Sequence, residues 1–262
     1  MRQNTLFWGL VLILAGGVLL LDNLGILQVN VWNILWPLFL IALGAWILWG
    51  TVSRRSPAVE HSNVPLDGAG RARIRFRHGA GRLQVQSGAG MADLAEGGFG
   101  GGLDLRTRRE GDLLNVDMAV PVQFFPIFWS PGFSLDWSVR LNRDTPLALE
   151  LNTGAGESRL DLSDLRVAEL SLHSGASSTE LTLPANAGQT RARIETGAAS
   201  VRVHIPAGVA ARIRAGGGLS SINIDATRFP RMGELYQSHD FDTANNRVDL
   251  DIQTGVGSIE IR

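Results

Sequence analysis

Two long apolar segments at the N-terminus restrict this chain more than any other feature. Residues 5–21 are almost continuously apolar, and residues 31–49 form a second run of the same kind. At about 1.5 Å of rise per residue, each run makes a helix of about 25–29 Å, which matches the hydrocarbon core of a bilayer. Because the connection between the runs is short, we predict a transmembrane helical hairpin over residues 1–50.

Two other interpretations of these runs fit less well. A signal peptide would explain the first run, but no small-x-small cleavage pattern follows Leu21, and the second run would still anchor the product. A buried hairpin in a soluble protein would need a very large core, because both helices are apolar on all faces.

The flanking charges predict the orientation of the hairpin. Arg2 precedes the first run, Arg54 and Arg55 follow the second, and the intervening loop carries only Asp22. Positively charged flanks favour the cytoplasmic side of a membrane. We therefore expect both termini in the cytoplasm of a cell whose plasma membrane holds this protein.

The charge balance and the absence of cysteine exclude several classes of protein. The 24 basic residues, all arginine, nearly equal the 25 acidic ones. A general nucleic-acid binder needs a marked basic excess, so nucleic acid is not an expected partner. A chain without cysteine has no disulfides, thiolate nucleophiles or iron–sulfur sites.

Beyond residue 50 the periodicity of the apolar residues changes from helical to two. Residues 51–66 contain Pro57 and Pro65 and lack periodicity, which predicts a linker. In the following segment Ala72, Ile74 and Phe76 alternate with arginine, a pattern typical of a strand with one buried face. Similar alternation recurs to the C-terminus, so we predict an all-β domain over residues 67–262.

A glycine-containing turn recurs between the predicted strands. It reads NTGAG, HSGAS, ETGAA, RAGGG and QTGVG, and its first glycines are Gly154, Gly175, Gly197, Gly216 and Gly255. The spacing indicates a repeat of about twenty residues, with the last interval holding two units and an insertion. One unit cannot bury its few apolar side chains alone, so we predict a stacked β-solenoid, with a β-sandwich as the alternative. The glycines are expected to supply a positive φ at tight corners.

Two stretches interrupt this pattern. Residues 91–102 end in GGFGGG, and residues 119–139 combine prolines with aromatic residues. The second stretch is not expected to form a regular central strand, because proline lacks a ladder donor. It is interpreted either as an aromatic plug on the open end of the solenoid or as a loop that contacts lipid or a partner. The contacting residues would include Phe124, Phe125, Phe128 and Trp129.

Four arginines form the clearest electrostatic feature. Arg71, Arg73, Arg75 and Arg77 share one face of a predicted strand close behind the second apolar run. They could contact anionic lipid head groups or an acidic partner. The alternative is a solvated face balanced by acids of a neighbouring strand.

The motifs do not predict catalysis. No helix is expected after the glycine pairs at Gly79 and Gly81 or at Gly88 and Gly90, so they do not form a phosphate-binding loop. The five histidines are scattered, without metal-ligand or triad spacing. We therefore expect no enzyme, no cofactor and no metal.

The layout resembles a known bacterial family. LFWGLVLILAGGVLLLDNLGIL followed by VWNILWPLFLIALGAWILWG resembles the LiaI/LiaF-like transmembrane region of envelope proteins. The array that ends in SHDFDTANNRVDLDIQTGVGSIEIR resembles the adhesin-type or toast-rack β-domains that accompany it. The resemblance implies a bacterial plasma-membrane protein that modulates a sensor kinase responding to cell-wall damage. An adhesin-like module, with the β-domain outside the cell, is the alternative.

Overall fold

The computed structural model describes residues 36–37, 39–41, 59–121 and 135–262. Residues 36–37 and 39–41, within the second apolar run, are helical, and the rest of both predicted spans lies outside the described residues. Among the residues described, no helix is long and apolar enough to cross a membrane.

The β-domain is one large mixed sheet of thirteen strands. Its strands are β1 (Val59–Pro65), β2 (Arg71–Ser87), β3 (Asp93–Gly100), β4 (Asp104–Glu110), β5 (Leu113–Ala119), β6 (Trp137–Leu141), β7 (Leu147–Asp161), β8 (Val167–Thr182), β9 (Gln189–His204), β10 (Ala210–Ile224), β11 (Arg231–Met232), β12 (Leu235–Gln237) and β13 (Arg247–Ile261). This confirms the prediction of a mostly β domain.

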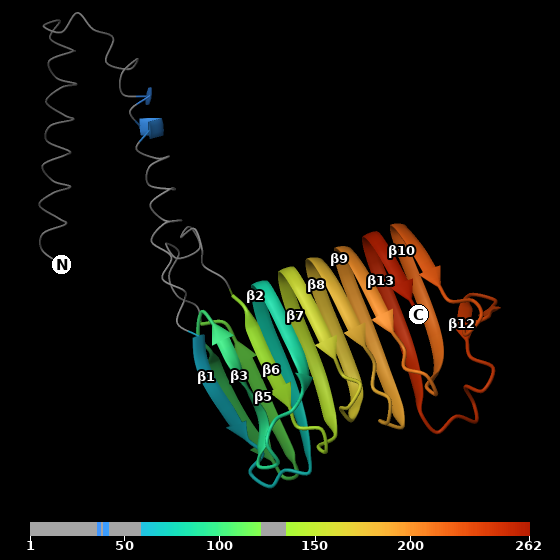
Figure 1. The fold of residues 1–262 in the computed structure, drawn as a ribbon, viewed down its shortest axis with the longest axis horizontal. Coiled ribbons are helices and arrows are strands. Elements are labelled where there is room, and N and C mark those ends of the chain that lie inside the picture. The colour runs from blue at the N-terminus through green and yellow to red at the C-terminus, as the bar shows by residue number, and fades with distance from the viewer. Residues whose placement is uncertain (1–35, 38, 42–58, 122–134) are drawn as a thin grey trace, which may run out of the picture. The chain divides into compact units, whose positions relative to one another are not determined.

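Six long strands form a rack in the order β2, β7, β8, β9, β13, β10 (Figure 1). All five neighbouring pairs are parallel, and each ladder runs through both halves of its strands. The first half of β2 also pairs with β5 and its second half with β6. Each long strand thus turns at a glycine corner and contributes to two layers.

The hydrophobic core lies between these two layers. In β9 the buried side chains include Ala192 and Ile194 before the corner, and Val201 and Val203 after it. The buried positions change from even to odd numbers at Gly197, because the strand changes direction there. Equivalent residues of the other long strands join the same cluster, so stacking completes a core that one unit could not form alone.

The corner glycines are required by close backbone approach. A Cβ atom on Gly175 would lie 2.7 Å from the carbonyl oxygen of Gly154, and one on Gly197 would lie 2.7 Å from that of Gly175. None of the five predicted turn glycines has a positive φ, so our expectation on this point was wrong. Left-handed φ values occur instead at the second glycine of some corners, at Gly81 (119°), Gly156 (144°) and Gly257 (143°).

The order of the rack differs from the order of the chain at its last two strands. β13 inserts between β9 and β10, and Gly217 of β10 pairs with Thr254 of β13. Gly218, not the predicted Gly216, therefore faces Gly255, whose carbonyl oxygen lies 3.0 Å from a Cβ placed on Gly218. The segment 225–246 accounts for the long interval between Gly216 and Gly255. Its residues Phe229 and Phe241 are buried.

Strands also occur where irregular segments were expected. β1 lies within the predicted linker 51–66 as an edge strand, and Val64 is its single fully buried residue. The glycine-rich segment 91–102 contains β3, in which Gly97 allows close approach to the carbonyl group of Ser138. In the segment 119–139, β6 begins at Trp137 and lies between β3 and β2. Periodicity missed these strands because glycine, proline and polar residues interrupt it.

His78 is a buried titratable group at the corner of β2. Its Nε2 atom lies 2.7 Å from the carbonyl oxygen of Leu135, and its ring packs on Trp137 with a centroid distance of 5.2 Å. Burial lowers the pKa of His78 below 6.5, although the Leu135 carbonyl and the charge of Asp136 oppose this.

The lowered pKa of His78 gives a testable pH dependence. The unfolded chain binds a proton more readily than the folded one, so stability should be lost as the pH falls below about 6.5 and through the lower folded pKa. We expect His78→Gln to remove this part of the pH dependence. Urea unfolding of the full chain in detergent, repeated across this pH range, measures it. Parallel profiles for the two proteins would contradict the expectation.

Candidate binding groove

A groove of about 1380 Å³ crosses the rack beside the glycine corners. It is lined by all six long strands, and the corner glycines Gly79, Gly154, Gly175, Gly197 and Gly255 form part of its surface. Five strand spacings of about 4.8 Å give it a length of about 24 Å. The groove therefore suits an extended polymer that lies across the strands.

One polar side chain from each of five neighbouring strands lines the groove. Arg77, Asn152, His173, Glu195 and Gln253 occupy equivalent register positions on β2, β7, β8, β9 and β13. Asp104 and Arg106 of β4 lie at one end, and Arg214 of β10 lies at the other. The row offers charges of both signs together with amide donors and acceptors.

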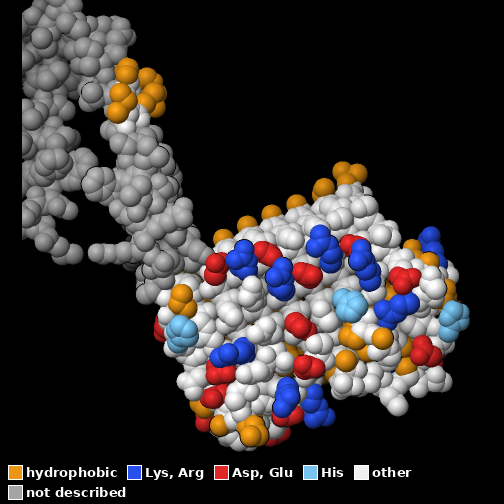
Figure 2. All heavy atoms as spheres, viewed as in Figure 1, with side chains coloured by type: hydrophobic (Ala, Val, Ile, Leu, Met, Phe, Trp, Pro, Cys, Tyr) orange, Lys and Arg blue, Asp and Glu red, His pale blue; other side chains and the backbone are white. Residues whose placement is uncertain are grey.

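Exposed apolar side chains form a ridge on the adjacent corner positions. Ala155, Ala176 and Ala198 follow the corner glycines, and Val256 and Leu219 continue the same row on β13 and β10. Figure 2 shows this ridge as orange side chains along the upper edge of the rack, above a face of interleaved acids and arginines. The groove thus has an apolar ridge along one side.

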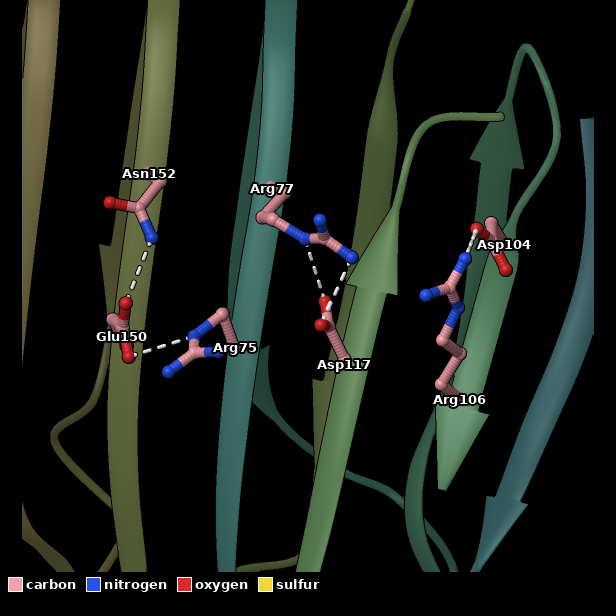
Figure 3. A network of polar contacts seen from close by, with 7 residues as sticks. All are labelled: Arg75, Arg77, Asp104, Arg106, Asp117, Glu150 and Asn152. Carbon is pink, nitrogen blue, oxygen red and sulfur yellow. Dashed lines mark hydrogen bonds and ion pairs between the residues drawn. The ribbon is translucent and has the colours of Figure 1, made fainter. Parts of the chain in front are cut away.

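An ion-pair network fixes the outer face at the β2 end (Figure 3). Arg75 Nε lies 2.9 Å from Glu150 Oε2, and Arg77 binds both carboxylate oxygens of Asp117 at 2.9 and 3.0 Å. Partial burial of Glu150 would raise its pKa, but hydrogen bonds from Asn152 and Arg75, with the charges of Arg75 and His173, lower the pKa below its ordinary value. Glu150 is therefore held as a carboxylate.

The four arginines predicted as a contact surface are all exposed on β2. Arg75 and Arg77 pair with acids of the neighbouring strands β7 and β5. For these two arginines the structure has the alternative arrangement, a solvated face balanced by acids of neighbouring strands. No ion pair involves Arg71 or Arg73 within the described residues. A contact of this face with lipid or a partner stays a prediction.

The other predicted contact and topology residues lie outside the described residues. They are Phe124, Phe125, Phe128, Trp129, Arg2, Arg54 and Arg55.

Ser171, His173 and Glu195 form a hydrogen-bonded relay that the sequence did not reveal. Ser171 Oγ lies 3.0 Å from His173 Nε2, and His173 Nδ1 lies 3.2 Å from Glu195 Oε2. This is the bonding order of a catalytic triad, which also requires donors for an oxyanion. Ser171 sits in the middle of β8, which is paired on both sides, so the surrounding backbone N–H groups serve the ladders. The relay therefore lacks a backbone oxyanion hole.

A row of small polar residues lies next to the corner glycines. Thr196 and Thr254 share a hydrogen bond of 2.7 Å between their hydroxyl groups. The buried hydroxyls of Thr153 and Ser174, in the same row, have no hydrogen-bond partner among the described residues. A buried hydroxyl without a partner is costly, so these positions are not explained by stability alone.

The described part of the chain contains no group of three or more His, Cys, Asp or Glu side chains that could hold an ion. The groove provides polar side chains at a fixed spacing. Sequence reasoning found the glycines but missed the polar row. The signal was the residue two positions before each glycine: Asn152, His173, Glu195 and Gln253.

The fold and groove define a class: a β-rack that carries a groove lined by a repeated row of polar side chains. A family profile described as the N-terminal domain of toast_rack, DUF2154, matches residues 53–204, and this chain belongs to that family. A second profile, the LiaI-LiaF-like transmembrane region, matches residues 6–48. The chain is thus a membrane protein of the LiaF type, as its resemblance indicated.

A solved structure supports the fold. A candidate cell adhesion protein from Clostridium sporogenes superposes with a TM-score of 0.71 at 21% identity, covering 78% of this chain and 98% of that one. At this identity the likeness concerns the fold alone. No curated protein matches the chain.

Proposed function

We propose that this protein is a non-enzymatic regulator or scaffold in bacterial cell-envelope stress signalling, and that its groove holds an extended segment of a membrane protein partner, with a sensor kinase as the candidate. The observation that carries the proposal is the continuous polar row across five neighbouring strands. Equivalent side chains at a fixed spacing suit recognition along a polymer. The match to the LiaI-LiaF-like region supports a partner in the membrane.

Binding accounts for this surface better than catalysis does. The Ser171–His173–Glu195 relay has no backbone oxyanion donors beside it, because both edges of β8 are paired. His173 and Glu195 instead take their places in the polar row. The contact between His173 and Glu195 fixes the orientation of both side chains. The row therefore presents hydrogen-bond donors and acceptors at fixed positions.

Site-specific photo-crosslinking in native membranes tests the proposal. A photoreactive amino acid at Gln253 lies in the groove, and the same residue at the exposed position Glu180 of β8 is a matched control outside it. We expect a crosslink from position 253 to an envelope sensor kinase, identified by mass spectrometry, and none from position 180. Equal products at both positions, or no kinase at position 253, would overturn the assignment.

An adhesin-like module is the second candidate function, favoured by the structural likeness to the candidate cell adhesion protein. It requires the β-domain outside the cell, whereas our proposal expects both termini in the cytoplasm. A reporter fused after Arg262 separates the two. Activity of a cytoplasm-only reporter supports regulation, and activity of an exterior-only reporter supports adhesion.

A further inference from the structure

The second half of β10 is an open sheet edge. β12 pairs with β10 only at Arg212 and Ile213, and the rest of β10 pairs only with β13 among the described strands. In a sheet, each strand directs alternate backbone N–H and C=O groups to its two sides. Residues 214–224 therefore present a row of backbone groups on the side away from β13.

This edge lacks the features that normally prevent strand pairing. From Ala215 to Ile224 it contains no charged residue and no proline, and Leu219 is 79% exposed. The edges at the other end differ: β4 reads DLRTRRE with five charged residues, and β1 ends in Pro65. Natural proteins protect edge strands with charge and proline, and an unprotected apolar edge pairs readily with another strand.

The core is also incomplete at this end of the rack. Ile222 of β10 pairs with Ile259 of β13 on the inward-facing row, yet Ile222 is 40% exposed whereas Ile259 is 1% exposed. Segment 225–246 covers the first half of β10 through β12, and the second half has no such cover among the described residues. One more strand beside β10 would bury Ile222 as its neighbours are buried.

We propose that a second copy of this chain supplies that strand, through antiparallel pairing of β10 with β10 of the partner across a two-fold axis. A neutral edge is self-complementary, because pairing it with itself brings no like charges together. A head-to-tail contact would instead place β10 on the charged β4 or the proline-ended β1. The dimer does not depend on the groove function, since residues 219–224 of the open edge do not line the groove.

The two-fold symmetry makes a sharp geometric demand. One residue of β10 lies opposite the same residue in the second copy. The two Cα atoms are then about 4.5–5.5 Å apart, a distance that permits a disulfide. A residue two positions away is separated from its own copy by four residues of strand, about 14 Å, which is too far.

A cysteine scan of the full chain in its membrane tests this demand, because the protein has no native cysteine. Single cysteines at positions 219 to 223 are oxidised and separated without reductant, with Thr107→Cys on β4 as the control. We expect one sharp maximum of crosslinked dimer within β10 and none at position 107. Crosslinking that is absent throughout the scan, or a product joining positions 221 and 107 in mixed samples, would overturn the proposal.

Charge substitutions give an independent readout at an exposed residue whose change should not affect the fold. Ser221→Lys and Ser221→Glu each place two like charges near the axis, and each should weaken the dimer about two- to fivefold. Coexpression of the two variants, carrying different tags, should restore a mixed dimer by co-purification. Undiminished self-association of both single variants would count against the interface.

Discussion

Gly197→Ala is expected to lower the free energy of unfolding by about 3 kcal/mol, the range found when a packed interior must accept a new atom. The added Cβ would lie 2.7 Å from the Gly175 carbonyl oxygen, closer than Cβ atoms are found in proteins. The residues on either side of Gly175, Ser174 and Ala176, are paired with both neighbouring strands, so the oxygen cannot move far without disturbing these ladders. Urea unfolding of the full chain in detergent, followed by protease resistance of the β-domain, measures the change.

Gly216→Ala provides the matched control for this substitution. Gly216 lies in the same kind of motif on β10, but a Cβ there meets no atom within 4 Å, and its φ is not positive. We expect a change within about 0.5 kcal/mol, as for an ordinary surface substitution. If Gly197→Ala were as stable as Gly216→Ala, close approach between neighbouring corners would not be the reason for glycine.

Trp137→Ala is expected to cost about 4 kcal/mol, the usual loss for removing a large aromatic side chain from a core. Trp137 is buried in β6 with its ring 5.1 Å from that of Phe99 and nearly perpendicular to it. Its Nε1–H also donates a hydrogen bond of 3.1 Å to the Gly100 carbonyl oxygen. The substitution therefore leaves a cavity and an acceptor that has lost its donor.

Trp137→Phe separates the two contributions. Phenylalanine keeps most of the ring packing but not the donor, so we expect a smaller loss of about 1–2 kcal/mol. Met91→Ala, at a residue exposed on the surface, should be near neutral. The same unfolding assay applies, and equal losses for the alanine variants at positions 91 and 137 would show that β6 does not anchor the core.

Much of the β-domain could be predicted from local patterns. The alternation of arginine with Ala72, Ile74 and Phe76 predicted a one-sided strand, and those three residues are buried in β2. Four of the five predicted corner glycines, including Gly154 and Gly175, do face one another across the rack. Such patterns are reliable because successive side chains of a strand point to opposite faces, so the alternation depends only on local geometry.

The glycine reasoning was right about position for four of the five glycines and wrong about cause. We attributed the glycines to positive φ, whereas these four are required because the carbonyl group of a corner glycine on the neighbouring strand lies too close for a Cβ atom. Sequence cannot separate these causes, since both exclude a Cβ. The distance to a neighbouring strand exists only once the strands are stacked.

The candidate groove was harder to predict than the fold. Its polar row contains Arg77, which was singled out for lipid contact, and Asn152 and Gln253, which were not singled out at all. The contact between His173 and Glu195 joins residues 22 positions apart on parallel strands. Scattered histidines and acids become neighbours only through the register of the ladder.

The sequence alone determined the two apolar N-terminal runs, the alternating strands and four of the five corner positions, because these depend on residues close together in the chain. Only the tertiary structure decided that β13 enters between β9 and β10, that Gly218 takes the corner position beside Gly255, and that one edge of β10 stays open. Strand order and register depend on which distant segments pair. A connection as long as segment 225–246 lets β13 pair on either side of β10 at a similar cost in chain entropy. The final choice follows from core burial and backbone pairing across the whole rack.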